Sequence, residues 1–181
     1  MKRTIGAVVG LAVAAGLTWA AVSPRQEFPK PQKEHDFLKR FEGTWETSIT
    51  FRMSPDQEWT TSKGTETSRM IGGFWLVSES KGEFMGMPFQ GLGTTGYDPY
   101  KKKYVSTWVD NFGPCLSVGE GTVSGDVMTG TVNGTDETGK PMTMKMKQEF
   151  KDKDTVVWSM TSVGKDGKEF ESMKGESKRK K

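Results

Sequence analysis

The sequence predicts an all-β protein: a single up-and-down antiparallel β-barrel of about nine or ten strands, with a short helix before it. Apolar and polar residues alternate with period two through successive segments, as in residues 45–53, where Trp45, Ile49 and Phe51 share one face. Turn-forming residues recur about every eight to twelve residues. No stretch between strands suggests a long crossover, and a meander that closes on itself leaves no exposed edge.

The first 22 residues have the pattern of a signal peptide or an N-terminal anchor. Lys2 and Arg3 precede an apolar run, and Thr18-Trp19-Ala20 is an acceptable cleavage signal. If it is not cleaved, the run to Val22 nearly has the length of a membrane span, and it would be the chain's only membrane contact. Both alternatives predict a periplasmic or secreted protein.

Residues 23–32 contain three prolines and several charges, which predict an exposed linker. The barrel domain is therefore assigned to residues 33–181. Its helix is predicted over residues 33–41, where Phe37, Leu38 and Phe41 share one face, and Gly43 ends it. The predicted strands then cover residues 45–53, 59–70, 74–80, 89–97, 102–110, 116–123, 127–133, 142–150, 155–163 and 169–177.

Three segments carry specific expectations. Residues 81–88 are predicted to form a loop or bulged link, and Asp166-Gly167 predicts a two-residue hairpin turn. The segment GLGTTG, residues 91–96, matches the GxGxxG pattern of dinucleotide-binding loops. A working loop opens a helix, but Asp98-Pro99 and a further alternating segment follow here, so we interpret its glycines as those of a bent strand.

Charge and reactive residues exclude several functions. The formal net charge is +3, and it includes the positive charges of the basic end, residues 178–181. The sequence shows no basic face with interleaved aromatic residues, which is the pattern expected of a nucleic-acid-binding protein. Cys115 is the only cysteine, which excludes an intramolecular disulfide, and we interpret it as a small apolar filler. His35, the only histidine, is interpreted as a surface or helix-packing residue.

A short helix followed by Gly43-Thr44-Trp45 resembles the start of lipocalins and other calycin barrels. The resemblance implies that Trp45 closes one end of the barrel and that a late basic residue packs across it. Arg179 suits that role, with Lys178 as the alternative, because a guanidinium over an indole is a favourable cation–π arrangement.

The chain also resembles the bacterial domain-of-unknown-function family fifteen seventy-nine, whose members are lipocalin-like. The resemblance rests on the helix and Trp45 opening, GTETSRMIGGFWLVSES, MGMPFQGLGTTGYDPYKKKYVSTWVDN and the closing GKEFESMKGESKRK. It implies a barrel fold, whereas the activity of that family is unassigned.

A barrel of this size can hold one small ligand, so we expect a hydrophobic or amphipathic molecule as partner. The residues assigned to ligand binding are Phe51, Trp59, Trp75, Met85, Met87, Tyr97, Trp108 and Asp110, with Met53 and Trp158 as further cavity-lining candidates. Alternatively, these apolar side chains fill a solid core, and the barrel has a structural or interaction role. Asp110 either faces the cavity mouth or caps the turn that begins at Asn111, and the second orientation is slightly favoured.

An enzyme is the less favoured alternative, and no catalytic residue is assigned. General acid–base chemistry would need His35 or paired carboxylates, but the acidic neighbours of His35 in sequence do not face it on a helix. Met142, Met144 and Met146 would suit Cu(I), yet their spacing also matches the apolar face of a strand. No metal, haem or other cofactor is assigned, and no oligomeric state.

Overall fold

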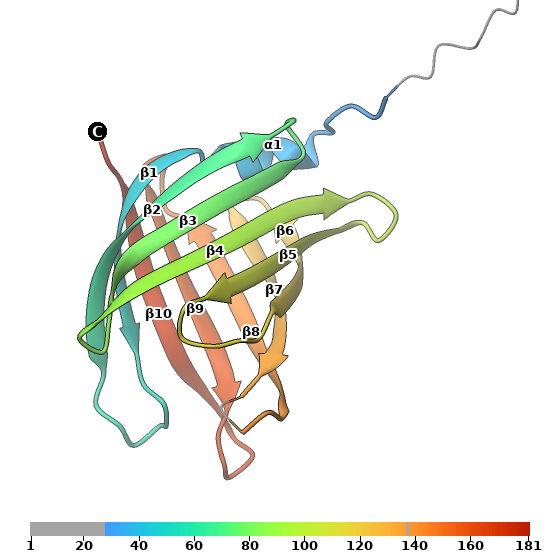
Figure 1. Cartoon of the computed structure of the whole chain (residues 1–181). Coiled ribbons are helices and arrows are strands. Elements are labelled where there is room, and N and C mark those ends of the chain that lie inside the picture. Colours follow the sequence, from blue (N-terminus) through green and yellow to red (C-terminus); the bar gives the residue numbers. More distant parts are fainter. Residues whose placement is uncertain (1–27, 137) are drawn as a thin grey trace, which may run out of the picture. The chain divides into compact units, whose positions relative to one another are not determined.

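The alternating segments pair into a closed barrel of ten antiparallel strands, each bonded to its neighbours in the sequence, with β10 closing onto β1. The computed structural model describes residues 28–136 and 138–181, and the barrel lies within the unit of residues 31–181 (Figure 1). The predicted all-β up-and-down barrel with a short preceding helix is therefore confirmed.

The elements follow one another with short connections. They are α1 (Glu34–Lys39), β1 (Gly43–Phe51), β2 (Thr60–Ile71), β3 (Trp75–Phe84), β4 (Met87–Asp98), β5 (Lys103–Asp110), β6 (Ser117–Ser124), β7 (Val127–Thr135), β8 (Pro141–Phe150), β9 (Thr155–Val163) and β10 (Glu169–Arg179). Residues 1–22, assigned to the leader, and part of the predicted linker lie outside the described residues. Within the described ranges, no helix is long and apolar enough to cross a membrane.

The prediction of a loop or bulged link over residues 81–88 is wrong. Strands β3 and β4 continue to a tight turn, because Phe84 pairs directly with Met87. Both residues of the turn have positive φ, 53° at Met85 and 76° at Gly86, which is the backbone of a type I′ hairpin. The usual Asn-Gly signal is absent from this turn, so the sequence did not reveal it.

The prediction of a two-residue turn at Asp166-Gly167 is also wrong. Pairing stops at Val163 and Glu169, and the chain between them forms a longer loop. The Gly164 amide donates to the Lys168 carbonyl oxygen at 2.8 Å, and Gly167 takes the left-handed conformation with φ of 77°. A hairpin loop with glycine at its left-handed position is the next commonest type.

The GLGTTG segment lies within β4, which confirms its interpretation as a strand. Its first two glycines give the Trp108 ring room on the inner face. A Cβ at Gly93 would lie 3.1 Å from that ring, and one at Gly91 would overlap it. These glycines therefore serve close packing of an aromatic side chain.

Trp45 and α1 close one end of the barrel. Trp45 is only 1% exposed, and its indole N–H donates to the Phe41 carbonyl oxygen at 2.8 Å. The Arg179 guanidinium lies 4.2 Å from the Trp45 ring, donates to the Arg40 carbonyl oxygen and pairs with Asp154 at 3.1 Å. Trp45 and Arg179 thus take the places that the calycin resemblance implies, whereas Lys178 pairs with Glu176.

Two side chains of this end anchor α1 to the strands. His35 is buried, accepts the Gln32 amide at Nδ1 and packs edge-on against Phe74 and Tyr97. The Tyr104 hydroxyl donates to the Glu34 carbonyl oxygen at 2.8 Å, and burial raises the pKa of Tyr104 to about 12. His35 is therefore a helix-packing residue in this structure.

Cys115 lies in the connection between β5 and β6, where it is exposed. The interpretation of this residue as an apolar filler is therefore wrong. Its neighbours Gly113 and Pro114 belong to a surface connection, so the side chain meets solvent and not the core.

Replacing Gly130 with alanine is expected to lower the free energy of unfolding by about 1–3 kcal/mol. A Cβ there would lie 2.7 Å from the Gly121 Cα and would overlap the Glu120 carbonyl oxygen, and this backbone cannot yield without parting β6 from β7. Gly113→Ala is the control, because a Cβ at Gly113 meets nothing within 4 Å. Urea denaturation should separate the two variants, and equal midpoints would contradict the close approach.

Candidate functional site

The barrel encloses a cavity of about 520 Å³, which runs from Leu38 of α1 and Phe41 just after it to Asp110 and Phe112 at the opposite end. We call that opposite end the mouth; the β3–β4 turn and the β5–β6 connection lie there. The cavity exists because the inward positions of neighbouring strands carry small side chains, which cannot fill a ten-stranded barrel. These positions are Ser62, Gly64, Ser78, Ser80, Gly82, Gly93, Thr95, Ser106, Ser117, Gly119 and Gly121.

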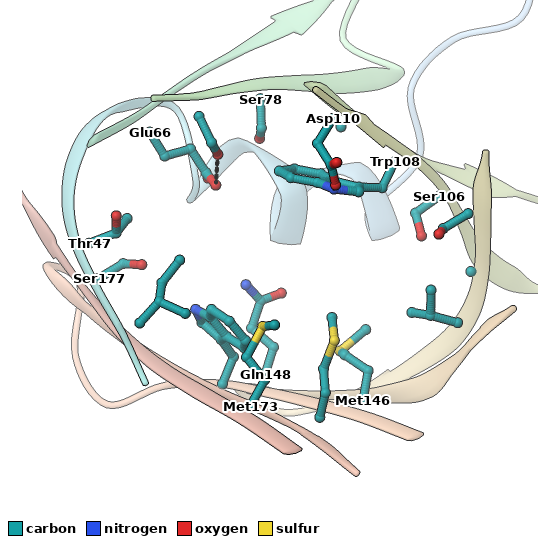
Figure 2. A pocket seen from close by; sticks show the side chains of 18 of the residues that line it. Thr47, Glu66, Ser78, Ser106, Trp108, Asp110, Met146, Gln148, Met173 and Ser177 are labelled. Carbon is teal, nitrogen blue, oxygen red and sulfur yellow. Dashed lines mark hydrogen bonds between the residues drawn. The ribbon is translucent and has the colours of Figure 1, made fainter. Parts of the chain in front are cut away.

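One side of the cavity, formed by β7 to β10, is mainly apolar, with Gln148 of β8 and Ser177 of β10 as polar exceptions. Met144 and Met146 of β8, Met160 of β9 and Met173 of β10 lie on its surface, together with Trp158. Register places Met146 opposite Met160, and Met160 opposite Met173, so these three side chains are neighbours on adjacent strands. Figure 2 shows Met146 and Met173 on the same side of the cavity. We call these four methionines the methionine wall. Unbranched thioether side chains adapt to irregular apolar ligands.

The facing side, formed by β1 to β3, carries hydroxyl groups and one carboxylate. The Glu66 carboxylate accepts hydrogen bonds from Ser68 at 3.2 Å and from Ser80 at 3.2 Å, one on each oxygen. Ser68 is in turn bonded to Ser78 at 2.7 Å. Figure 2 shows Glu66 and Ser78 across the cavity from Met146 and Met173. We call Glu66, Ser68, Ser78 and Ser80 the polar cluster.

Burial raises the pKa of Glu66 above its ordinary value of 4.5, and the hydrogen bonds from the serines oppose that shift without cancelling it. No basic side chain contributes to the pKa of Glu66 in the part of the chain that the structure describes. The cluster therefore holds an acidic group whose charged form has no counter-ion among the described residues.

Trp108 and Asp110 line the cavity from β5, toward the mouth. The Trp108 indole N–H donates to Asp110 Oδ2 at 2.9 Å, and the Phe112 amide donates to Oδ1 at 2.9 Å. Asp110 was expected either to face the cavity mouth or to cap the turn that begins at Asn111. Its carboxylate does both, because it lines the cavity and accepts the Phe112 amide of that turn.

Four of the other residues assigned to ligand binding lie away from the cavity surface. Trp75 is on the outer face, 46% exposed, and covers Gly96 of the next strand. Trp59 lies before β2, where its ring contacts Arg52 and Lys174 at 4.5 Å each. Met85 lies in the β3–β4 turn, Met87 follows that turn, and both are exposed.

Phe51 and Tyr97 point inward but belong to the two ends of the barrel. Phe51 is buried and stacks on Phe84 with ring centroids 4.4 Å apart. Tyr97 packs against His35 and, at 5.2 Å between centroids, against Tyr104. Of the further candidates, Trp158 lines the cavity and Met53 is exposed.

Sequence reasoning missed Glu66 and assigned no ligand role to the methionine wall. The threonine-rich stretch of β2 does not alternate in hydropathy, so its inward phase was not apparent. Met70 reveals which residues of β2 face inward, because its side chain packs against the core. The residues that precede it at intervals of two share its face, and they are Ser68, Glu66, Gly64 and Ser62. Serines and glycines on the inward face of β2 are too small to fill the barrel interior, which is the sequence signal for a cavity.

Glu66→Gln is expected to raise the melting temperature at pH 8 and to leave it nearly unchanged at pH 4. A carboxyl with a raised pKa in the folded state holds its proton while the unfolded chain loses it. Stability therefore falls as pH rises from 4.5 toward the higher folded pKa. Glutamine has the same shape and cannot ionise, so the variant escapes that loss. Thermal unfolding from pH 4 to pH 8 measures the effect.

The control for this variant is Glu79→Gln, which removes one negative charge from an exposed outer position of β3. Its melting temperature should not show the pH-dependent gain expected for Glu66→Gln. A Glu66→Gln variant that is less stable than the parent by the same amount at every pH would contradict the raised pKa of Glu66.

The described residues contain no group of three or more His, Cys, Asp and Glu side chains arranged to hold a metal ion. Met144 and Met146, considered for Cu(I), belong to the apolar wall of the cavity.

Comparison with known proteins gives a family and a fold. A family described as "Protein of unknown function (DUF1579)" matches residues 30–179. The crystal structure of Rv2717c from M. tuberculosis is similar, with a TM-score of 0.62 and 14% identity over 84% of this chain and 100% of that one. At this identity the likeness shows the barrel fold alone.

Designed barrels also match, less closely. A de novo designed fluorescence-activating β-barrel has a TM-score of 0.44 and 21% identity, over 80% of this chain and 98% of that one. The redesigned barrel mFAP1, bound to DFHBI, has a TM-score of 0.44 and 15% identity, over 78% of this chain and 97% of that one. The search of curated proteins found no match.

Proposed function

The chain belongs to the DUF1579 family of proteins of unknown function, and we propose that it binds a small amphipathic molecule inside its barrel. One observation carries the proposal: the cavity of about 520 Å³ has an apolar side and a facing polar side. Ligand sites in proteins span about 300–1,000 Å³ and combine apolar lining with a few placed polar groups.

The two sides of the cavity would bind different parts of the ligand. The methionine wall and Trp158 offer apolar surface to the body of a ligand, and burial of that surface supplies affinity without demanding one shape. The polar cluster gathers a carboxylate and three hydroxyl groups at one place, and this favours one direction for the polar end of a ligand.

The ligand would enter at the mouth, opposite α1. Phe84, Phe89 and Phe112 lie along this end of the cavity, with ring centroids 5.1 Å apart for Phe84 and Phe112 and 6.0 Å for Phe89 and Phe112. Phe112 is 40% exposed and belongs to the connection after β5, so a small displacement of that ring would widen the entrance.

An extracytoplasmic location is part of the proposal. It is supported by the basic start, apolar run and cleavage signal of residues 1–22. Detection of the mature protein in a periplasmic or secreted fraction, shorter by the leader, would support it, whereas the full-length chain in the cytosol would contradict it.

The binding proposal is tested with N-phenyl-1-naphthylamine, an uncharged apolar dye whose fluorescence rises when it leaves water. We expect saturable enhancement at one dye per chain, and energy transfer from tryptophan, because Trp108 and Trp158 both line the cavity. Native mass spectrometry of protein from its natural host should show a bound small molecule. A barrel that leaves the dye unchanged and carries no ligand would contradict the proposal and favour a structural role.

A further inference from the structure

We propose that the ligand carries a positively charged amine at its polar end and that Glu66 binds this amine deep in the cavity. The inference rests on the proposed function and names the chemical class of its ligand. An amine ligand at Glu66 would exclude fatty acids and other carboxylates, which an apolar barrel cavity could otherwise bind.

The position of Glu66 sets the depth of the amine. Register places Glu66 of β2 beside Trp45 of β1, whose ring belongs to the closed end, and beside Ser80 of β3. Asp110, the other carboxylate of the cavity, lies toward the mouth and caps the turn there. A ligand whose amine reaches Glu66 would therefore lay its apolar body along the methionine wall, between the closed end and the mouth.

The ionisable side chains that face the cavity are acidic. Glu66 and Asp110 face inward, whereas no lysine or arginine of the described strands is directed into the space between the closed end and the mouth. Lys63 and Lys81 border the cavity, but they alternate with Gly64 and Gly82, so their side chains point outward and both residues are exposed. Arg179 is engaged at the closed end by Trp45 and Asp154.

Glu66 has the hydrogen-bonding capacity that such a ligand needs. A carboxylate offers about four acceptor sites on its two oxygens, and the bonds from Ser68 and Ser80 occupy one site on each oxygen. An ammonium group has three N–H donors and no acceptor, so it can donate to the remaining sites and to a serine oxygen. A ligand carboxylate would instead meet a second negative charge and find no cationic partner.

Among the described residues Glu66 has no counter-ion, and the proposed ligand would supply one. A buried charge without a partner is unfavourable, and the polar cluster meets this only in part with neutral hydroxyl groups. An amine ligand would complete the site, whereas a neutral alcohol would add one hydrogen bond and no charge compensation. The difference in affinity between an amine and an alcohol of the same chain length therefore tests the role of Glu66.

The test compares three probes with the same ten-carbon chain, decylamine, decan-1-ol and decanoate, as competitors of bound N-phenyl-1-naphthylamine at pH 7 and below their micelle concentrations. We expect decylamine to displace the dye at a concentration about tenfold or more below that of decan-1-ol, a difference equal to one charge-assisted contact. Decanoate should be the weakest of the three.

Glu66→Gln should remove this preference, with decylamine about tenfold weaker and decan-1-ol unchanged. A cooperative thermal unfolding curve like that of the parent would show that the variant is folded. The control Glu79→Gln, an exposed outer position of the neighbouring strand, should keep the order of the parent.

Equal binding of amine and alcohol, tightest binding of decanoate, or an unchanged decylamine affinity in Glu66→Gln would each overturn the inference while leaving the cavity as a ligand site. Failure of the dye and of all three probes to bind would overturn the proposed function as well.

Discussion

Trp45→Ala is expected to lower the free energy of unfolding by about 3–5 kcal/mol, the cost typical of removing a large aromatic side chain from a core. The indole is 1% exposed, and its N–H donates to the Phe41 carbonyl oxygen at 2.8 Å. Its ring also lies under the Arg179 guanidinium at 4.2 Å and near Phe150. Removal therefore opens a void at the point where the segment that follows α1 meets β1 and β10.

Trp75→Ala is the control for this loss, because it deletes the same side chain from the outer face, where Trp75 is 46% exposed. Its cost should be less than half that of Trp45→Ala. Urea denaturation followed by far-ultraviolet circular dichroism measures both. Similar midpoints for the two variants would contradict the role of Trp45 as the closing residue of the barrel.

The second large effect is expected from filling the cavity. Thr47→Phe combined with Ser106→Phe should weaken binding of N-phenyl-1-naphthylamine more than about tenfold, or about 1.4 kcal/mol. Both residues line the cavity, Thr47 from β1 and Ser106 from β5, and they lie on opposite sides of it (Figure 2). Two phenyl rings directed toward each other would occupy the space that the dye needs. No hydrogen bond of the Thr47 side chain is lost.

The matched control places the same two rings on the outer face of the same strands, as Ser48→Phe combined with Val109→Phe. Val109 is exposed and Ser48 alternates with Thr47, so the cavity stays open in this variant. Dye titration, together with a melting curve to show that both variants fold, gives the comparison. Undiminished binding by the filled barrel would mean that the dye binds elsewhere on the protein.

The strands were predictable because most of them alternate and end at turn residues. The positions of Trp45 and Arg179 were also foreseen, through the Gly43-Thr44-Trp45 opening and the basic end of the chain. Turns depend on local backbone conformation, and Met85-Gly86 forms a type I′ turn without the residues that normally announce it. The extent of the β3–β4 hairpin was therefore missed.

The site was harder to predict because the direction of a side chain depends on the phase of its strand. Trp75, Leu76 and Val77 are consecutive apolar residues, so alternation does not say which of them faces inward. Gly96 on the neighbouring strand decides it, by leaving room for the Trp75 ring on the outer face. Glu66 was missed for the related reason that its strand is polar on both faces.

The most direct test of ligand binding inside the barrel is the NMR spectrum of protein labelled with ¹³C at its methionine methyl groups, recorded with and without decylamine. The methyls of Met144, Met146, Met160 and Met173 face the cavity, whereas Met53 and Met85 are exposed near the mouth. We predict saturable shifts of the four inner methyls, larger than those of the two exposed ones. Shifts confined to Met53 and Met85, with the inner methyls unmoved, would contradict a ligand site inside the barrel.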